Sequence, residues 1–360
     1  MAQLQSVAAV ASNAVWITIG VFAALFALTL ALRIVRSKKY RSRRSDRDDA
    51  EWKIRYNTVY EYRGNAARVV VPEGVTDVFS KAFYKKSVQT VVLPTTLRQM
   101  HAMAFSHCPN LQEVVLPQNF HWDEREEYFY ESPRLSAVTY HGKRCTDFVI
   151  EDGTLLLCLV KNNVVETPQG IRRIGSRAFS SSSNRAYTQI RVSEGVREIG
   201  ANAFRGISIK QIVLPSTVQT LAEESITFCT DLRSVEIVGV GEFDGLLVLG
   251  DTLIAAFGDK ECYVVPEGVK RIGKLAFSTA LNCTQSIRLP DTLEYIGSHA
   301  FSFLPYVERL RIPQSVREIE MRAFEFWREN QTLEMPLRFR AQAGGDNCWN
   351  EKCRARIEYV

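Results

Sequence analysis

Beyond residue 68 the hydrophobic and polar positions repeat every 22 to 25 residues. The best-preserved segments are VVVPEGVTDVFSKAF (69–83), VVLPTTLRQMHAMAF (91–105), IRVSEGVREIGANAF (190–204), YVVPEGVKRIGKLAF (263–277), IRLPDTLEYIGSHAF (287–301) and LRIPQSVREIEMRAF (310–324). Their shared pattern is apolar-x-apolar-Pro-x-x-apolar-x-x-Ile-Gly-x-x-Ala-Phe, and nine copies of it are recognisable. A unit of this length cannot bury its own apolar face, so the pattern predicts one continuous solenoid of stacked coils.

Each unit predicts one short strand followed by a turn. Val91 and Leu93 alternate with Val92, which is the period of a strand with one buried face. The proline ends the strand because it has no N–H to donate to the next coil. Apolar residues three and six positions later point inward, and the Ala-Phe pair packs small against large between coils.

Two gaps in the repeat are themselves regular. Pro117 and Pro168 are separated by 51 residues, as are Pro215 and Pro266. Each gap contains an Asp/Gly turn between apolar stretches, which is typical of a β-hairpin. The inserted hairpins are expected near 145–166 and 243–264. Corresponding residues in the two gaps lie 98 apart, so the repeats group in threes within a duplicated unit.

The template LPxxLxxIGxxAFxxCxxL resembles the BspA-type leucine-rich repeat over about residues 69 to 336. The resemblance implies an α/β-type solenoid, a right-handed coil with a parallel sheet on one face and short helical or turn segments on the other. It also implies adhesion or protein-interaction surfaces, with no catalytic residues to carry over. The chain departs from the template at Ser193, at Ile226 and in the acidic stretch WDEREE (122–127).

An apolar run occupies the N-terminal region. No charged residue precedes Arg33, and the apolar run, as a helix, is roughly 28 Å long, enough to cross a bilayer. We predict a transmembrane helix at 14–35, after a short tail (1–13) and before a basic linker (36–50). A cleaved signal peptide is the alternative, but it calls for a positively charged start and a small-residue cleavage site.

The positive charge of the chain is concentrated beside this run. Residues 33–49 contain eight basic and three acidic residues, which equals the net charge of +5 of the whole chain. The remainder is neutral, so no nucleic-acid partner is expected. The asymmetry predicts an outside N-terminus and a cytoplasmic repeat domain, with lipid contacts through Ala14–Val35 and the basic run Arg36–Arg44. The alternative is an extracellular or luminal repeat domain, in which Asn282 and Asn330 are glycosylation sequons.

The ends of a solenoid need covering. We predict an N-terminal cap at 51–68 and a C-terminal cap at 337–360. The first is rich in aromatic residues, namely Trp52, Tyr56, Tyr60 and Tyr62. The second contains Cys348 and Cys353, a spacing that alone is a weak metal signal and that allows a disulfide only in an oxidising compartment.

The sequence contains no recognisable catalytic constellation. G-x-S-x-G, H-E-x-x-H, P-loop and G-x-G-x-x-G motifs are absent. His101 and His107 lie near Cys108, but this cysteine falls in a slot of the repeat that suits a small apolar side chain. The carboxylates of 122–127 indicate a solvated face. We therefore expect no enzyme activity, no metal, no cofactor and no small-molecule substrate.

A solenoid offers the outward residues of its sheet for binding. These residues, two positions before each proline slot, are Val70, Val92, Val115, Arg191, Val213, Glu236, Arg288 and Arg311. The charged members Arg191, Glu236, Arg288 and Arg311 are the candidate contacts. Arg288 and Arg311, on neighbouring strands, suit the carboxylates or phosphates of a partner. The predicted function is a membrane-anchored protein-interaction scaffold, with a cell-surface or luminal adhesion module as the alternative.

Overall fold

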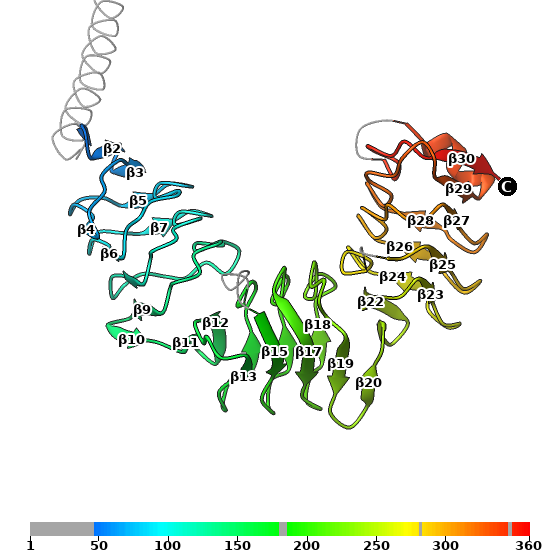
Figure 1. Cartoon of the computed structure of the whole chain (residues 1–360), viewed down its shortest axis with the longest axis horizontal. Helices are drawn as coiled ribbons and strands as arrows, with labels where there is room; N and C mark the ends of the chain where they lie inside the picture. Colours follow the sequence, from blue (N-terminus) through cyan, green and yellow to red (C-terminus); the bar gives the residue numbers. More distant parts are fainter. Residues whose placement is uncertain (1–46, 180–185, 281–282, 345–347) are drawn as a thin grey trace, which may run out of the picture.

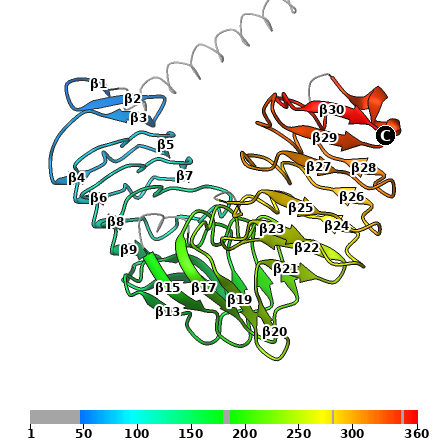
Figure 2. The same ribbon diagram turned by 45° about the vertical axis from the view of Figure 1, so that its right-hand side comes forward.

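The computed structural model describes residues 47–179, 186–280, 283–344 and 348–360. They form a β-solenoid of about 13 turns that is bent into a U (Figure 1). Turned by 45°, the same molecule shows its first and last thirds as two arms joined by the middle third (Figure 2).

The expected membrane localisation needs correction. In the parts of the chain that the structure describes, no helix has both the length and the apolarity to cross a bilayer. This finding overturns the expectation of a single-pass membrane protein with cytoplasmic repeats. The expected span at 14–35 and the basic run at 36–44 lie outside the described residues.

Most coils contain two strands, where the sequence analysis predicted one. The first strand precedes the proline, and a second strand of two residues follows it. In one coil, β25 (Ser286–Arg288) leads through Pro290 to β26 (Tyr295–Ile296). Stacking therefore builds two parallel sheets, which we call the long-strand face and the short-strand face.

Turns replace the helical segments that the α/β-type class implied. After the short strand the backbone passes through a residue in the left-handed region, for example His299 and Arg322, both with φ of 55°. Such a residue ends a right-handed helix before it can propagate. Within the described residues the structure has a single helical element, the 3-10 helix η2 (Leu337–Gln342). The fold is thus a solenoid of strands and turns.

Threonine side chains join the turns of successive coils. The Gly268 N–H donates to Thr292 Oγ1 at 3.0 Å, and this hydroxyl donates to the Val269 carbonyl at 2.9 Å. Thr96 and Thr217, each also two residues after a proline, make the same pair of bonds. The bonds satisfy backbone groups that the turn leaves unpaired.

Block 1 (47–145) opens with a hairpin. Its short-strand face has the order β1 (Arg47–Asp48), β2 (Trp52–Arg55), β3 (Thr58–Tyr62), β5 (Asp77–Val78), β7 (Gln99–Met100). Its long-strand face has the order β10 (Lys143–Cys145), β9 (Ala137–Tyr140), β8 (Glu113–Val115), β6 (Thr90–Val92), β4 (Arg68–Val70). In this described stretch the coil of β8 has no short strand, because the acidic segment 122–127 takes its place.

Block 2 (148–243) also opens with a hairpin, which lies within 145–166. Its short-strand face has the order β11 (Phe148–Glu151), β12 (Thr154–Cys158), β14 (Arg173–Ile174), β16 (Glu198–Ile199), β18 (Thr220–Leu221). Its long-strand face has the order β13 (Val164–Glu166), β15 (Ala186–Arg191), β17 (Ser208–Leu214), β19 (Ser234–Ile237), β20 (Gly241–Phe243). All neighbours are parallel except at the two hairpins.

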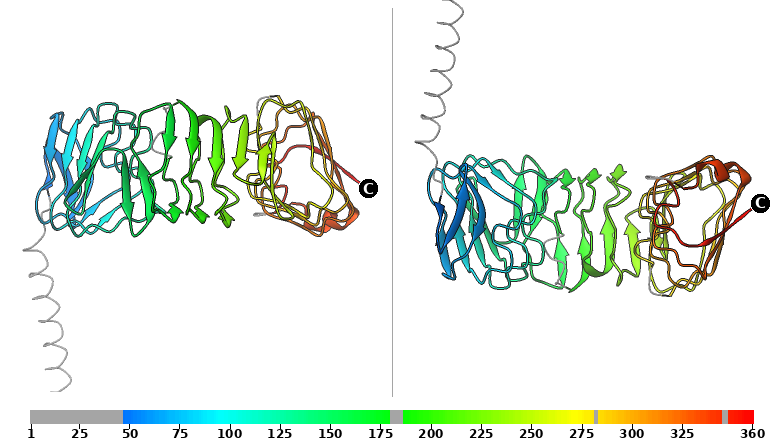
Figure 3. Two further views of the ribbon diagram at one scale, coloured as in Figure 1. Left: turned by 90° about the horizontal axis from the view of Figure 1, so that it is seen from below. Right: turned by 90° about the horizontal axis from the view of Figure 1, so that it is seen from above.

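Block 3 (246–360) repeats the arrangement, with its hairpin within 243–264. Its short-strand face has the order β21 (Leu246–Leu249), β22 (Thr252–Ala256), β24 (Arg271–Ile272), β26, β28 (Glu318–Ile319). On its long-strand face β23 (Cys262–Val264) pairs with β25, and β27 (Arg309–Arg311) leads to β29 (Thr332–Met335) and β30 (Arg356–Tyr359). In Figure 3 this block is viewed along its own coil axis, whereas the middle block is viewed from the side.

The higher-order unit is therefore present three times, where the sequence analysis recognised two. Thr58, Thr154 and Thr252 each begin the second strand of an opening hairpin. The segment expected as an aromatic cap is the first of these hairpins. Three clusters of buried apolar residues follow the same division, one for each block with a small overlap at each junction.

Stacked phenylalanines form the centre of each block. Ring centroids are 4.8 Å apart for Phe83 and Phe105, and 5.2 Å apart for Phe179 and Phe204. In block 3 Phe301 lies between Phe277 at 5.0 Å and Phe324 at 5.6 Å. Tryptophan and tyrosine close the two ends of the solenoid, with Trp52 and Tyr62 packed on Phe83 and Trp349 packed on Phe324.

We predict that Phe301→Ala lowers the free energy of unfolding by about 3–5 kcal/mol, because the ring is fully buried between two others. Urea unfolding followed by the fluorescence of Trp327 and Trp349 measures the change in this block. Phe303→Ala is the control, since Phe303 is 47% exposed. An equal loss in both variants would contradict the role of the stack.

Candidate binding surfaces

Two of the four predicted contact residues lie on the long-strand face of block 2. Arg191 of β15 is in register with Glu166 of β13 and with Val213 of β17, and Glu236 of β19 lies beyond Val213. A whole strand therefore separates Arg191 from Glu236. Val213, expected on the surface, is fully buried, because it lies between these two longer side chains.

The other two residues are brought together on the long-strand face of block 3. Arg288 ends β25 and Arg311 ends β27, and the two strands lie against each other. Both side chains are exposed, and within the described residues neither has an ion pair or a side-chain hydrogen bond. Adjacent like charges repel, so the pair favours an anionic group. Arg309, by contrast, is paired with Glu334 and Glu358.

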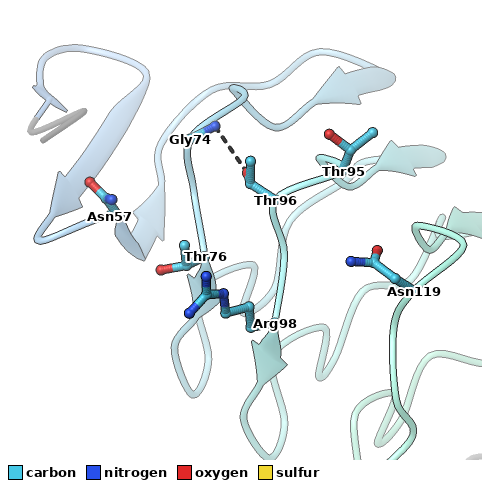
Figure 4. Close-up of a pocket in the computed structure, with 7 residues that line it drawn as sticks. All are labelled: Asn57, Gly74, Thr76, Thr95, Thr96, Arg98 and Asn119. Atoms are coloured by element: carbon cyan, nitrogen blue, oxygen red, sulfur yellow. Dashed lines mark hydrogen bonds between the residues drawn. The ribbon is translucent and has the colours of Figure 1, made fainter. Parts of the chain in front are cut away.

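A polar pocket that the sequence analysis missed opens in block 1 (Figure 4). Its volume is about 510 Å³, and its lining residues are Asn57, Gly74, Thr76, Thr95, Thr96, Arg98 and Asn119. The lining offers hydroxyls, amides and one guanidinium, with no aromatic or aliphatic residue. Figure 4 shows that Asn57 comes from the turn of the β2–β3 hairpin, and the other residues from successive coils, where each long strand leads into the turn before the short one. The signal in the sequence was a cluster of polar residues after consecutive prolines.

The repeat family is shown by direct comparison. The family described as "BspA type Leucine rich repeat region" matches residues 53–148, 149–242 and 260–351, with 6 copies. The chain belongs to the BspA-type leucine-rich repeat family. The three matched segments follow the three blocks of the structure closely. A search of the curated proteins finds no match to this BspA-type chain.

Several solved structures are similar to this BspA-type solenoid. One is a leucine rich cell surface protein from Faecalibacterium prausnitzii, with 19% identity and a TM-score of 0.47, covering 84% of this chain and 90% of that one. A leucine-rich repeat protein from Eubacterium ventriosum has 16% identity and a TM-score of 0.43, covering 71% and 75%. The pneumococcal vaccine antigen PcpA has 16% identity and a TM-score of 0.37, covering 84% and 94%.

The junction between blocks 1 and 2 of this BspA-type chain depends on one carboxylate. Arg173 Nη1 lies 2.6 Å from both carboxylate oxygens of Glu124, and the Ser176 N–H donates to Glu124 Oε2 at 3.0 Å. Glu124 was expected to be solvated, but it caps the turn of the next block. Gly175 makes room for it, since a Cβ there would lie 3.0 Å from Glu124 Oε2.

The junction between blocks 2 and 3 has the same arrangement of a carboxylate and a glycine. The Lys274 N–H donates to Glu223 Oε2 at 2.9 Å, and Lys274 Nζ lies 3.2 Å from Glu224 Oε1. Gly273 again leaves room for the acidic residue of the preceding block. A carboxylate on the preceding coil and a glycine on the next one thus recur at both junctions.

A histidine forms a second link across the first junction. His141 Nδ1 lies 2.6 Å from the Gln118 carbonyl, and His141 Nε2 lies 2.9 Å from Glu151 Oε1 of β11. The Gln118 carbonyl first, and the Glu151 carboxylate second, raise the pKa of His141, because both ring nitrogens face acceptors. The link is therefore strongest when the imidazole is protonated.

The positions of potential metal ligands and cysteine thiols in the fold show whether the described residues could form a metal site or a nucleophile. They contain no group of three or more His, Cys, Asp or Glu side chains able to hold a metal ion. Cys108 and Cys229 are buried, and their thiols donate to the carbonyls of Phe83 and Phe204. Burial raises the pKa of Cys108 to about 11, so this thiol is a packing residue and not a nucleophile.

We predict that Glu124→Gln destabilises the first junction by about 1–2 kcal/mol, because it removes the charge from a partly exposed ion pair and a backbone cap. Hydrogen exchange of 172–178 measures the effect. Glu198→Gln is a matched control, since Glu198 also faces Arg173, at 3.4 Å, but is 59% exposed. If both variants exchange alike, the junction does not depend on Glu124.

We predict that the link made by His141 weakens as the pH rises. A raised pKa means that its contribution is complete below the unfolded value of about 6.5. The contribution is lost as the pH rises through the folded pKa. Limited proteolysis of the β11–β12 hairpin between pH 5.5 and 8.5 should show faster cleavage at high pH, relative to a distant site. His141→Gln should abolish this dependence, and an unchanged profile in that variant would count against it.

Proposed function

We propose that the chain is a binding module for protein interaction or adhesion, and not an enzyme. The observation that carries this proposal is the pair of exposed, unpaired arginines, Arg288 and Arg311, on adjacent strands of block 3. An anionic segment of a partner protein would satisfy both guanidinium groups and relieve their mutual repulsion. The BspA-type repeat places the two side chains at equivalent positions of successive coils, at the ends of the contacting strands β25 and β27.

The other two candidate contacts, Arg191 and Glu236, lie in block 2 and are not part of the proposed site. Arg191 lies beside Glu166, which offers it a carboxylate on the neighbouring strand. Glu236 is half-buried and in register with Glu242 of β20. Neither forms a compact patch with block 3. The cap and repeat boundaries at 51–68, 69–336 and 337–360 stay as proposals, as does the absence of a nucleic-acid partner, a small-molecule substrate and a cofactor.

The proposal is tested by photo-crosslinking. We expect benzoylphenylalanine at position 288 to give adducts with a partner in the native source, and the same residue at position 210 to give none. Position 210 is the control, since Lys210 is an exposed residue of β17 in another block. The double variant Arg288→Glu with Arg311→Glu should lower binding of the identified partner by about tenfold or more. Equal adducts at both positions, or unchanged binding by the double variant, would refute this site.

A further inference from the structure

One backbone position of the coil carries different residues in block 1 than in the other blocks. It directly follows the short strand, and its N–H donates to the carbonyl of the preceding coil. In blocks 2 and 3 it is occupied by Gly175, Gly200, Ala222, Gly273, Gly297 and Glu320. In block 1 the same bond is made by Phe79, to Val59 at 2.9 Å, and by His101, to Val78 at 2.9 Å.

The glycines are explained by the close approach of successive coils. A Cβ on Gly200 would lie 2.9 Å from the Ser176 nitrogen, and one on Gly297 would lie 2.8 Å from the Lys274 nitrogen. Two residues at this position in blocks 2 and 3 are not glycine. One of them, Ala222, adds only a methyl group. Glu320 accepts hydrogen bonds from the Ser298 N–H and the Tyr295 hydroxyl.

The aromatic residues of block 1 form an exposed row instead. Tyr60 precedes the row in register, and the ring centroids are 5.1 Å apart for Tyr60 and Phe79 and 5.5 Å apart for Phe79 and His101. Phe79 is 43% exposed and Tyr60 36%. The corresponding hairpin residues Leu156 and Ile254 are 4% and 5% exposed. The row therefore exposes ring surface to solvent. Two of its rings, Phe79 and His101, occupy the position that is mostly glycine in blocks 2 and 3.

The aromatic row and the polar pocket of Figure 4 share the segments of β3, β5 and β7, with a pocket residue directly before each strand. Each ring follows a pocket residue by three positions: Tyr60 follows Asn57, Phe79 follows Thr76, and His101 follows Arg98. Three residues of extended chain span about 10 Å. Val75 and Val78 are buried, which leaves Thr76 and Phe79 on the outside of the coil. A single ligand can therefore contact both the rings and the pocket.

This surface has no surplus of positive charge. Arg98 is the single cation of the pocket, while the Asp77 carboxylate accepts from the Thr76 hydroxyl at 2.5 Å, and the Glu73 carboxylate accepts from the Thr95 N–H at 3.1 Å. A polyanion such as a nucleic acid needs a surplus of cations, which this surface lacks. A protein hot spot needs an aromatic anchor in a packed, desolvated pocket, whereas the rings of Tyr60 and Phe79 lie on an open surface.

We propose that the short-strand face of block 1 binds a neutral oligosaccharide. The C–H faces of sugar rings pack against the electron-rich faces of Tyr60, Phe79 and His101. The sugar hydroxyls exchange hydrogen bonds with the Asn119 amide and accept from the Arg98 guanidinium. The hydroxyls of Thr76 and Thr95 already donate to Asp77 and Glu73, so they accept from the sugar. The proposal rests on the chain being a binding module, but it uses a different surface from Arg288 and Arg311.

Affinity electrophoresis of the full chain tests this proposal. The probes are the neutral polysaccharides laminarin, mannan and galactomannan, with polygalacturonate and heparin as anionic comparators. We expect at least one neutral polysaccharide to retard the chain and the anionic ones to have no effect. Phe79→Ala and Asn119→Ala should each weaken retardation by about tenfold or more. A normal far-ultraviolet spectrum and melting temperature exclude loss of folding.

The control is Phe303→Ala. Phe303 and Phe326 are 47% and 46% exposed and lie 4.3 Å apart, so they form a similar pair of exposed rings in block 3, and neither lines the polar pocket. This variant should retain full binding, as should Arg288→Glu with Arg311→Glu, which affects the other proposed surface alone. Retardation by no neutral polysaccharide, or by the anionic ones alone, would overturn the proposal. So would equal loss in Phe79→Ala and Phe303→Ala, or a protein ligand that depends on Phe79.

Discussion

The spacing between hydrogen-bonded strands is the constraint on which this solenoid depends. Parallel strands lie about 4.8 Å apart, so residues at equivalent positions of successive coils must stack at nearly that distance. Flat aromatic rings accept this spacing, as Phe83 on Phe105 at 4.8 Å and Phe277 on Phe301 at 5.0 Å show. At Gly200 and Gly297 the backbones of neighbouring coils come so close that an added Cβ would lie within 3 Å of a backbone nitrogen. The repeat pattern therefore reflects which side chains can stack on their equivalents in neighbouring coils at this distance.

The bends of the molecule occur where this stacking is interrupted. Block 2 ends its aromatic stack at Phe204, because the next coil has Ile226 in the phenylalanine position. At each junction a hairpin opens a new short-strand sheet, and a carboxylate of the preceding coil, Glu124 or Glu223, caps a backbone N–H of the next. Because a carboxylate and a glycine meet there in place of a continuous ladder, the coil axis can change direction. The U in Figure 1 follows from these two junctions.

The sequence predicted those features that depend on contacts between neighbouring coils. The strand before each proline, the buried alanine and phenylalanine, and the two inserted hairpins all follow from local alternation and turn residues. The short-strand face was missed, because a two-residue strand such as Tyr295–Ile296 is too short to show a period. The opening hairpin of block 1 was not recognised as a third copy of the inserted hairpins, because Tyr60 stands where the other two have Leu156 and Ile254. The role of Glu124 depends on Arg173, which lies 49 residues away, and no local pattern reports such a pair.

Departures from the repeat divide into those that packing explains and those that it does not. The acidic segment 122–127 breaks the template, and its Glu124 joins two blocks. Glu320 breaks it as well, and its carboxylate binds a neighbouring turn. Phe79 and His101 break it at the equivalent position, yet their rings contact each other and solvent instead of the core. Exposed aromatic surface gains nothing for folding. On this ground we propose that the row of rings and the pair Arg288 and Arg311 are surfaces for contacts with other molecules.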